Sequence, residues 1–177
     1  LGLFGYVKGT ADKKAEIKNL MLSGKLDITE NYRNSFAYSG GLVGGAEYVS
    51  FTDITTNVAV TAKKGSAPYP WSYVGGFAGT VKNADFLRCV NNGTVTTDGD
   101  YVSGFAAKSE TTTYTSCVNN GAITGRTKIG GFGGAVKSTK TVDSYNTGTI
   151  GLAAYNGGNQ GIGGLFGEMG YGSTLTR

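Results

Sequence analysis

Histidine is absent from this 177-residue chain, and cysteine and proline occur only twice each. Without imidazole the protein lacks the usual general base, the usual metal ligand and a serine–histidine relay. Two thiols alone cannot complete a zinc site, so the sequence predicts no metal and no cofactor. The 12 acidic residues are few and dispersed, whereas carboxylate catalysis needs them close together. We therefore expect that this chain is not an enzyme.

Long apolar runs and clusters of like charge are also missing. No run of about 18 apolar residues exists, which argues against membrane insertion. The 16 basic residues produce a net charge of +4, but they are scattered, whereas a nucleic-acid site needs them clustered on one face. Asp98-Gly99-Asp100 has the composition of a tight turn and lacks the further oxygen ligands of a calcium loop. The sequence thus predicts no nucleic-acid, membrane or metal partner.

Glycine, in contrast, occurs 31 times and organises the chain into repeats. A phrase of small and apolar residues recurs six times, as Gly2-Leu3-Phe4-Gly5, Gly41-Leu42-Val43-Gly44, Gly76-Phe77-Ala78-Gly79, Gly104-Phe105-Ala106-Ala107, Gly131-Phe132-Gly133-Gly134 and Gly164-Leu165-Phe166-Gly167. Successive copies start 39, 35, 28, 27 and 33 residues apart. A period of roughly 20 to 50 residues is typical of stacked architectures, because one repeat cannot bury its apolar face alone.

Aligning the copies on their first glycine produces three columns of equivalent, mostly apolar positions. The first column holds Leu3, Leu42, Phe77, Phe105, Phe132 and Leu165; the second holds Leu20, Ile54, Cys89, Cys117 and Ser144; the third holds Leu26, Val60, Val95, Ile123 and Ile150. Residues around the columns alternate with the period of two that indicates half-buried strands. The chain is predicted to be all-β, a parallel β-solenoid with three short strands per turn. We expect about five turns plus a partial sixth, coiled right-handedly because parallel crossovers nearly always are.

Residues 1–177 are expected to form one domain. Its approximate repeats are 1–39, 40–74, 75–102, 103–129, 130–162 and a partial repeat 163–177. The first repeat falls into register with the others if Ala11-Asp12-Lys13-Lys14-Ala15 is a five-residue insertion. Because the chain starts within one glycine phrase and stops shortly after another, we expect it to be part of a longer array.

Double glycines, asparagines and cysteines recur at fixed places in the repeat. Gly40-Gly41 and its equivalents are expected where the chain turns a corner, either with positive φ or because neighbouring turns approach closely. Asn91-Asn92, Asn119-Asn120 and Asn146 are expected to hydrogen-bond along the stack as a ladder. Cys89 and Cys117 should stack about 5 Å apart, within reach of a disulfide. Their column is apolar, so two free thiols packed as small hydrophobic groups are expected.

The alternation of Gly-Gly-Leu-Val-Gly or Gly-Gly-Phe-Ala-Gly with Cys-Val-Asn-Asn-Gly resembles the GLUG repeat of bacterial surface proteins. Such repeats occur in adhesin-like proteins and beside the peptidase domain of immunoglobulin A proteases. The resemblance covers nearly the whole chain, although the fourth copy ends in Ala106-Ala107 rather than glycine. It implies an extracellular, non-catalytic role for a secreted or cell-surface protein.

The repeats vary in length mainly between the third column and the next glycine phrase. Segments 27–40 and 61–75 are the longer ones of two adjacent turns, and such insertions project from one edge of a solenoid. They carry seven candidate ligand-binding residues, namely Tyr32, Arg33, Phe36, Tyr38, Tyr69, Trp71 and Tyr73. Aromatic rings offer a large contact area at small entropic cost, which suits protein and sugar partners. The alternative is that these rings pack on the side of the solenoid.

Three functions follow from these observations. The first is an extracellular binding or adhesion module whose aromatic edge contacts a host or environmental glycan or glycoprotein. The second is an inert structural spacer, and the third is an accessory region of a secreted peptidase. The protein is expected to be monomeric apart from contacts between solenoid ends.

Overall fold

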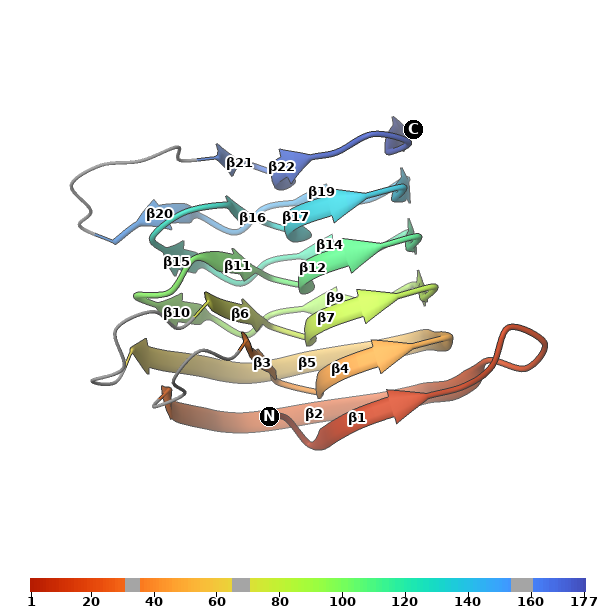
Figure 1. Cartoon of the computed structure of the whole chain (residues 1–177), viewed down its shortest axis with the longest axis horizontal. Coiled ribbons are helices and arrows are strands. Elements are labelled where there is room, and N and C mark those ends of the chain that lie inside the picture. Colours follow the sequence, from red (N-terminus) through yellow and green to blue (C-terminus); the bar gives the residue numbers. More distant parts are fainter. Residues whose placement is uncertain (31–35, 65–70, 154–160) are drawn as a thin grey trace.

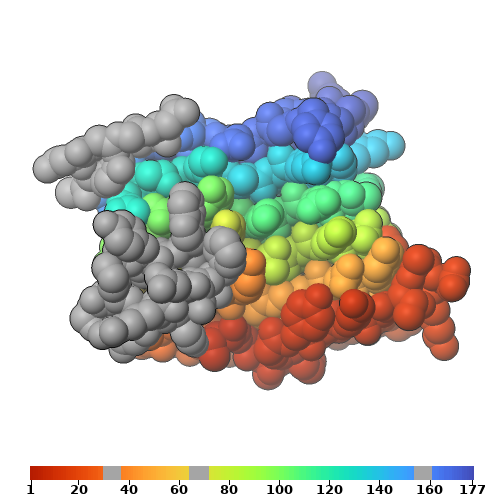
Figure 2. Space-filling view, in the orientation of Figure 1, coloured from red at the N-terminus to blue at the C-terminus, as the bar shows by residue number. Residues whose placement is uncertain are grey.

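The structure is a computed structural model, and it describes residues 1–30, 36–64, 71–153 and 161–177. The described residues form strands, turns and bends without a helix. The chain winds through successive turns that stack on one another from the N-terminal to the C-terminal end (Figure 1). In the space-filling view the turns lie in bands that follow the order of the sequence (Figure 2). The all-β parallel solenoid predicted from the repeats is therefore confirmed.

Three parallel sheets run along the stack. Sheet A contains one strand from each of six turns, in the order β1 (Phe4–Lys8), β4 (Val43–Glu47), β7 (Ala78–Lys82), β12 (Ala106–Glu110), β17 (Gly133–Lys137) and β22 (Phe166–Met169). Sheet C contains β3 (Phe36–Gly40), β6 (Trp71–Gly75), β11 (Tyr101–Ser103), β16 (Ile129–Gly130) and β21 (Ile162–Gly163). Every pairing between these strands is parallel and joins consecutive turns.

Sheet B is built differently in early and late turns. The first two turns supply one 16-residue strand each, β2 (Ala15–Glu30) and β5 (Val49–Lys64). Later turns replace this strand with short ones, namely β8 (Asp85–Leu87), β9 (Val90–Asn91), β10 (Val95–Thr97), β13 (Thr113–Thr115), β14 (Val118–Asn119), β15 (Ile123–Gly125), β18 (Lys140–Val142), β19 (Tyr145–Asn146), β20 (Ile150–Leu152) and β23 (Thr174–Thr176). The expected three strands per turn thus correspond to three sheets, with sheet B divided into pieces in the later turns.

The three apolar columns lie in register inside the stack. Phe105 stacks on Phe77 and on Phe132, with ring centroids 4.7 and 4.6 Å apart. Leu20 pairs with Ile54, and Val95 pairs with both Val60 and Ile123. The first two columns line one core and the third lines a second, smaller core between sheets B and C. The register confirms five extra residues but places them within 9–14 rather than 11–15. Lys8 pairs with Glu47 and Ala15 with Val49, which leaves six residues opposite one.

The double glycines serve close approach rather than unusual backbone geometry. Among the described glycines only Gly24 and Gly172 have positive φ, so the positive-φ prediction for the double glycines is wrong. A Cβ on Gly41 would stand 2.5 Å from the carbonyl oxygen of Gly76, and one on Gly131 would stand 2.6 Å from that of Gly164. Neighbouring turns therefore leave no room for a side chain at this corner.

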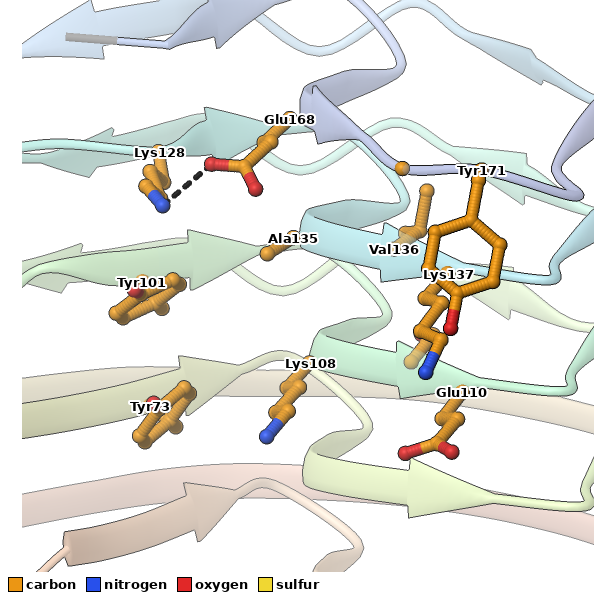
Figure 3. A pocket seen from close by; sticks show the side chains of 12 residues that line it. Tyr73, Tyr101, Lys108, Glu110, Lys128, Ala135, Val136, Lys137, Glu168 and Tyr171 are labelled. Carbon is orange, nitrogen blue, oxygen red and sulfur yellow. Dashed lines mark ion pairs between the residues drawn. The ribbon is translucent and has the colours of Figure 1, made fainter. Parts of the chain in front are cut away.

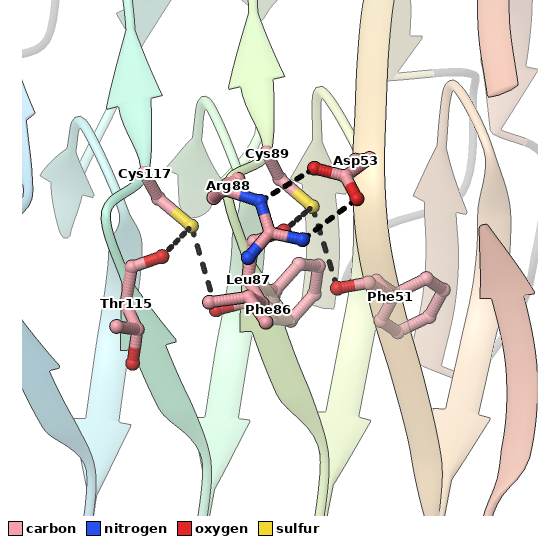
Figure 4. A network of polar contacts seen from close by, with 8 residues as sticks. All are labelled: Phe51, Asp53, Phe86, Leu87, Arg88, Cys89, Thr115 and Cys117. Atoms are coloured by element: carbon pink, nitrogen blue, oxygen red, sulfur yellow. Dashed lines mark hydrogen bonds and ion pairs between the residues drawn. The ribbon is translucent and has the colours of Figure 1, made fainter. Parts of the chain in front are cut away.

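Residues other than glycine adopt the left-handed conformation at the remaining corners. Two columns of positive φ run along the stack, one with Tyr48, Asn83, Thr111 and Ser138 and the other with Asn19, Asp53, Arg88, Ser116 and Asp143. Within the second, Arg88 donates two hydrogen bonds of 2.7 Å to the carboxylate of Asp53 (Figure 4). The bidentate pair joins two turns at an exposed corner.

Asparagine side chains form the predicted ladder. Asn91 Nδ2 donates to Asn119 Oδ1 (2.7 Å), and Asn119 Nδ2 donates to Asn146 Oδ1 (2.6 Å). Each of the three also donates to the carbonyl oxygen of the glycine two residues later. A second, exposed row runs beside it, in which Asn120 donates to Asn92 and Asn92 to Asn57. The inner ladder gives acceptors to the buried amide nitrogens of Asn91 and Asn119, while Oδ1 of Asn91, at the end of the ladder, has no hydrogen-bond partner among the described residues.

The two cysteines are free and fully buried, as the apolar column predicts. The Cys89 thiol donates to the carbonyl oxygen of Phe51 (3.5 Å), and the Cys117 thiol donates to that of Thr115 (3.3 Å) (Figure 4). The interaction with the neighbouring Cys117 thiol, followed by burial, raises the pKa of Cys89. Both thiols are fully buried in the apolar column, so this pair has a packing role.

Candidate functional site

The structure describes only part of the predicted aromatic edge. Tyr32, Arg33 and Tyr69 lie outside the described residues. Phe36 and Trp71 pair in register on β3 and β6, where the backbone alone is described. The side chains of Tyr38 and Tyr73 are described, and these residues lie on strands of sheet C rather than on projecting loops.

Tyr38 and Tyr73 belong to a tyrosine ladder that sequence reasoning missed in part. Tyr73 pairs with Tyr38 on one side and with Tyr101 on the other. The Tyr73 and Tyr101 rings stack with centroids 4.5 Å apart, and the Tyr38 and Tyr73 rings are 5.2 Å apart and tilted. Tyr73 is only 6% exposed, so the middle ring of the ladder is enclosed by its neighbours.

A hollow of about 410 Å³ opens beside this ladder, on the outer side of sheet A. Ala135 lies at its centre, between Tyr101 and Lys108 on one side and Lys137 on the other (Figure 3). The equivalent positions of neighbouring turns carry Lys108 and Glu168, so the small side chain of Ala135 leaves the space open. The hollow therefore lies on a rigid sheet and needs no loop to form it.

Three lysines from two successive turns surround the hollow. Lys128 Nζ lies 5.0 Å from the centre of the Tyr101 ring and forms an ion pair with Glu168. Lys108 Nζ lies 5.9 Å from the Tyr73 ring, and Lys137 Nζ lies 4.7 Å from the ring of Tyr171. These are cation–π distances, at which the negative ring face stabilises the ammonium group.

An alternating column of charge borders the hollow. Lys8, Glu47, Lys82, Glu110 and Lys137 occupy one outward position of sheet A in five successive turns. Opposite charges on adjacent strands are mutually favourable, and Lys8 Nζ and Glu47 Oε2 are 2.9 Å apart. The hydrogen bond from Lys8 lowers the pKa of Glu47.

A second hollow of about 250 Å³ lies nearer the N-terminal end of the same sheet. Its lining includes Tyr6, Thr80 and Lys82, and it shares Lys108 and Glu110 with the first hollow. The two hollows are therefore neighbours along the stacking axis and meet at β12.

Sequence spacing contained a signal for this site. Tyr38, Tyr73, Tyr101 and Lys128 each stand three residues before the first glycine of the next phrase. Lys108, Ala135 and Glu168 each stand four residues after one. No regular spacing indicates which residues of sheet A meet which residues of sheet C, because that depends on how the chain turns between the two sheets.

Tyr73 makes the stability of the site sensitive to alkaline pH. Burial, followed by the charge of Tyr101, raises the pKa of Tyr73 from its ordinary value of 10.0 to about 12. The unfolded chain therefore ionises first, so this stabilisation is complete below about pH 10 and is lost as the pH rises towards 12. In Tyr73→Phe we expect the loss of unfolding free energy over this pH range to be smaller than in the wild type by on the order of 1 to 2 kcal/mol.

The measurement is urea unfolding at several pH values between about 9 and 11. Tyr145→Phe is the control, because Tyr145 is exposed. An unchanged pH profile in Tyr73→Phe would contradict the enclosed position of this ring.

Several of the acidic side chains form ion pairs with lysine or arginine. Asp53 pairs with Arg88, Asp85 with Lys14, and Asp100 with Arg126. Across the described ranges, no group of three or more metal-ligating side chains is placed to hold an ion. None of the same residues forms a helix long and apolar enough to span a membrane.

Comparisons with protein-family models, with curated proteins and with solved structures find no match for this chain. The site is therefore interpreted from its own geometry, which comprises an enclosed tyrosine ladder, an open hollow over Ala135 and lysines on three sides.

Proposed function

We propose that this chain is a non-catalytic extracellular binding or adhesion module, and that the hollow over Ala135 holds its ligand. The observation that carries the proposal is the hollow of about 410 Å³ lined by aromatic, cationic and small residues on a continuous six-stranded sheet. A site on a rigid sheet loses little conformational entropy when it binds. The extracellular setting, in a secreted or surface-attached protein, rests on the resemblance to GLUG-containing adhesins.

The ligand class proposed is a glycan or glycoprotein. Tyr101 and the exposed Tyr171 provide aromatic surface, and three lysines provide hydrogen-bond donors for hydroxyl and acidic groups. Tyr32, Arg33, Phe36, Tyr69 and Trp71 stay candidate ligand-binding residues from the sequence, and of these Phe36 and Trp71 lie on β3 and β6 of sheet C. The chain has one tryptophan, so the fluorescence of Trp71 would report binding on that side.

The test fills the hollow and leaves the fold intact. Ala135 is on the outer side of β17, so Ala135→Phe should place a ring in the space that a ligand needs. We expect at least about a tenfold loss of affinity for immobilised mucin or polysaccharide, a change of about 1.4 kcal/mol. Binding is measured by surface plasmon resonance on a panel of glycans.

Thr124→Phe is the matched control, because it adds the same ring to the partly exposed Thr124 of β15 in sheet B, away from the hollow. Equal binding by wild type, Ala135→Phe and Thr124→Phe would contradict the proposed site. Absence of binding to every glycan and glycoprotein would favour the inert spacer instead. An accessory role beside a peptidase would be supported by a zinc-binding His-Glu-x-x-His motif in an adjoining domain.

A further inference from the structure

The tyrosine ladder offers its ring edges to the hollow. Tyr73 and Tyr101 stack at 4.5 Å with planes 18° apart, so each covers one face of the other (Figure 3). Tyr38 stands on the far side of Tyr73, and Lys128 stands over Tyr101. A neutral sugar that needs an open ring face would find little of it on this ladder. Ring edges carry partial positive charge, which favours an anionic neighbour.

The carboxylates that line the hollow already have cationic neighbours. Glu168 forms an ion pair with Lys128. Glu110 stands in register between Lys82 and Lys137. The negative charge of the lining is therefore balanced from within the protein.

Lys108 differs from Lys128, which forms an ion pair with Glu168, and from Lys137, which stands in register with Glu110. It is exposed and forms no ion pair with a carboxylate among the residues that the structure describes. Its neighbours in register are Thr80 and Ala135, which carry no charge. Lys108 also borders both hollows, so its ammonium group stands at the middle of the sheet A surface.

From these contacts we infer that the ligand of the hollow is an acidic polysaccharide, with a carboxylate or sulfate group beside Lys108. The inference rests on the proposed function and specifies its ligand. A polymer fits better than a single sugar, because two hollows adjoin along the stacking axis and share Lys108. Lys108 contributes a charge-assisted hydrogen bond, and the edges of Tyr73 and Tyr101 add a favourable field.

The test compares four probes on the whole chain, namely polygalacturonate, dextran sulfate, neutral dextran and duplex DNA. We expect binding to polygalacturonate or dextran sulfate, with the stronger of the two identifying the acidic group. Affinity should fall as salt rises, because the contact is partly exposed. Lys108→Gln should weaken binding about tenfold, and Lys108→Arg should restore most of it.

Lys140→Gln is the matched control, since Lys140 is an exposed lysine on β18 of sheet B and the change in net charge is the same. Equal losses in Lys108→Gln and Lys140→Gln would overturn the inference, as would tighter binding to duplex DNA. Binding to neutral dextran that Ala135→Phe abolishes and Lys108→Gln leaves unchanged would overturn the acidic ligand and leave the proposed function standing. No binding to any probe, together with none in the glycan panel, would overturn both.

Discussion

Gly104→Ala is expected to destabilise the protein by about 3 kcal/mol, because the added methyl group has nowhere to go. A Cβ at this position would stand 2.6 Å from the carbonyl oxygen of Gly131 and still closer to the side chain of Asn119. Asn119 cannot rotate away without breaking its hydrogen bonds to Gly121 and Asn146. Thermal unfolding followed by circular dichroism measures the loss, expected as a fall in Tm of about 6 to 12 °C.

The control is Gly164→Ala, at the same position of the last phrase. A Cβ on Gly164 has no heavy atom within 4 Å in the described structure, so this variant should unfold like the wild type. Equal behaviour of the two variants would mean that neighbouring turns are not packed as tightly as the structure shows. The comparison isolates turn-to-turn contact, because both substitutions make the same chemical change.

Asn119→Ala is expected to cost about 3 to 5 kcal/mol, since it removes the middle member of a buried ladder. Asn91 Nδ2 would keep Gly93 and lose the other of its two acceptors, and the carbonyl oxygen of Gly121 would lose its donor. Each buried polar group left without a partner costs about 1 to 3 kcal/mol, and the cavity adds to this. Guanidinium unfolding would show a lower midpoint, and a broader transition if the stack separates into two halves.

Asn120→Ala tests whether the burial of the ladder decides the effect. Asn120 also donates to a neighbouring asparagine, Asn92, but its side chain is exposed and water can replace the bond. We expect a loss of about 1 kcal/mol or less. A loss as large as that of Asn119→Ala would refute the distinction between the inner and outer rows.

Stability and binding are assigned to different parts of the repeat. The columns that face inward, with the glycines and Asn119, hold the turns together. Outward positions of sheet A, such as Lys108 and Ala135, do not pack in the core and are free to differ between turns. The solenoid can therefore carry a local hollow at one turn without disturbing the stacking of the others.

The large exposed apolar side chains of the described residues lie in the first repeat and in the last two. Leu3 is 56% exposed at one end and Leu175 is 56% exposed at the other, whereas Phe105 in the middle is buried. A solenoid end lacks the neighbour that would cover its columns, so contacts between ends remain the expected route to association. Whether the protein is otherwise monomeric stays a prediction.

The repeat alone determined the architecture of this protein. Spacing of the glycine phrases predicted the parallel stack, and alignment of Phe77, Phe105 and Phe132 predicted the column that the structure shows. The asparagine ladder and the free thiols also followed, since residues at equivalent positions of a stack must be neighbours. These features involve equivalent residues of successive repeats, and aligning the repeats in the sequence is enough to identify such residues.

The tertiary structure decided what lies side by side across different sheets. Spacing did not show that Tyr101 of sheet C and Lys108 of sheet A border one hollow, because that depends on the angle at which the chain turns between them. It also did not show that the double glycines avoid positive φ, since close approach and backbone freedom favour the same residue. Periodicity determines the contacts along the axis, and only the folded cross-section determines those around it.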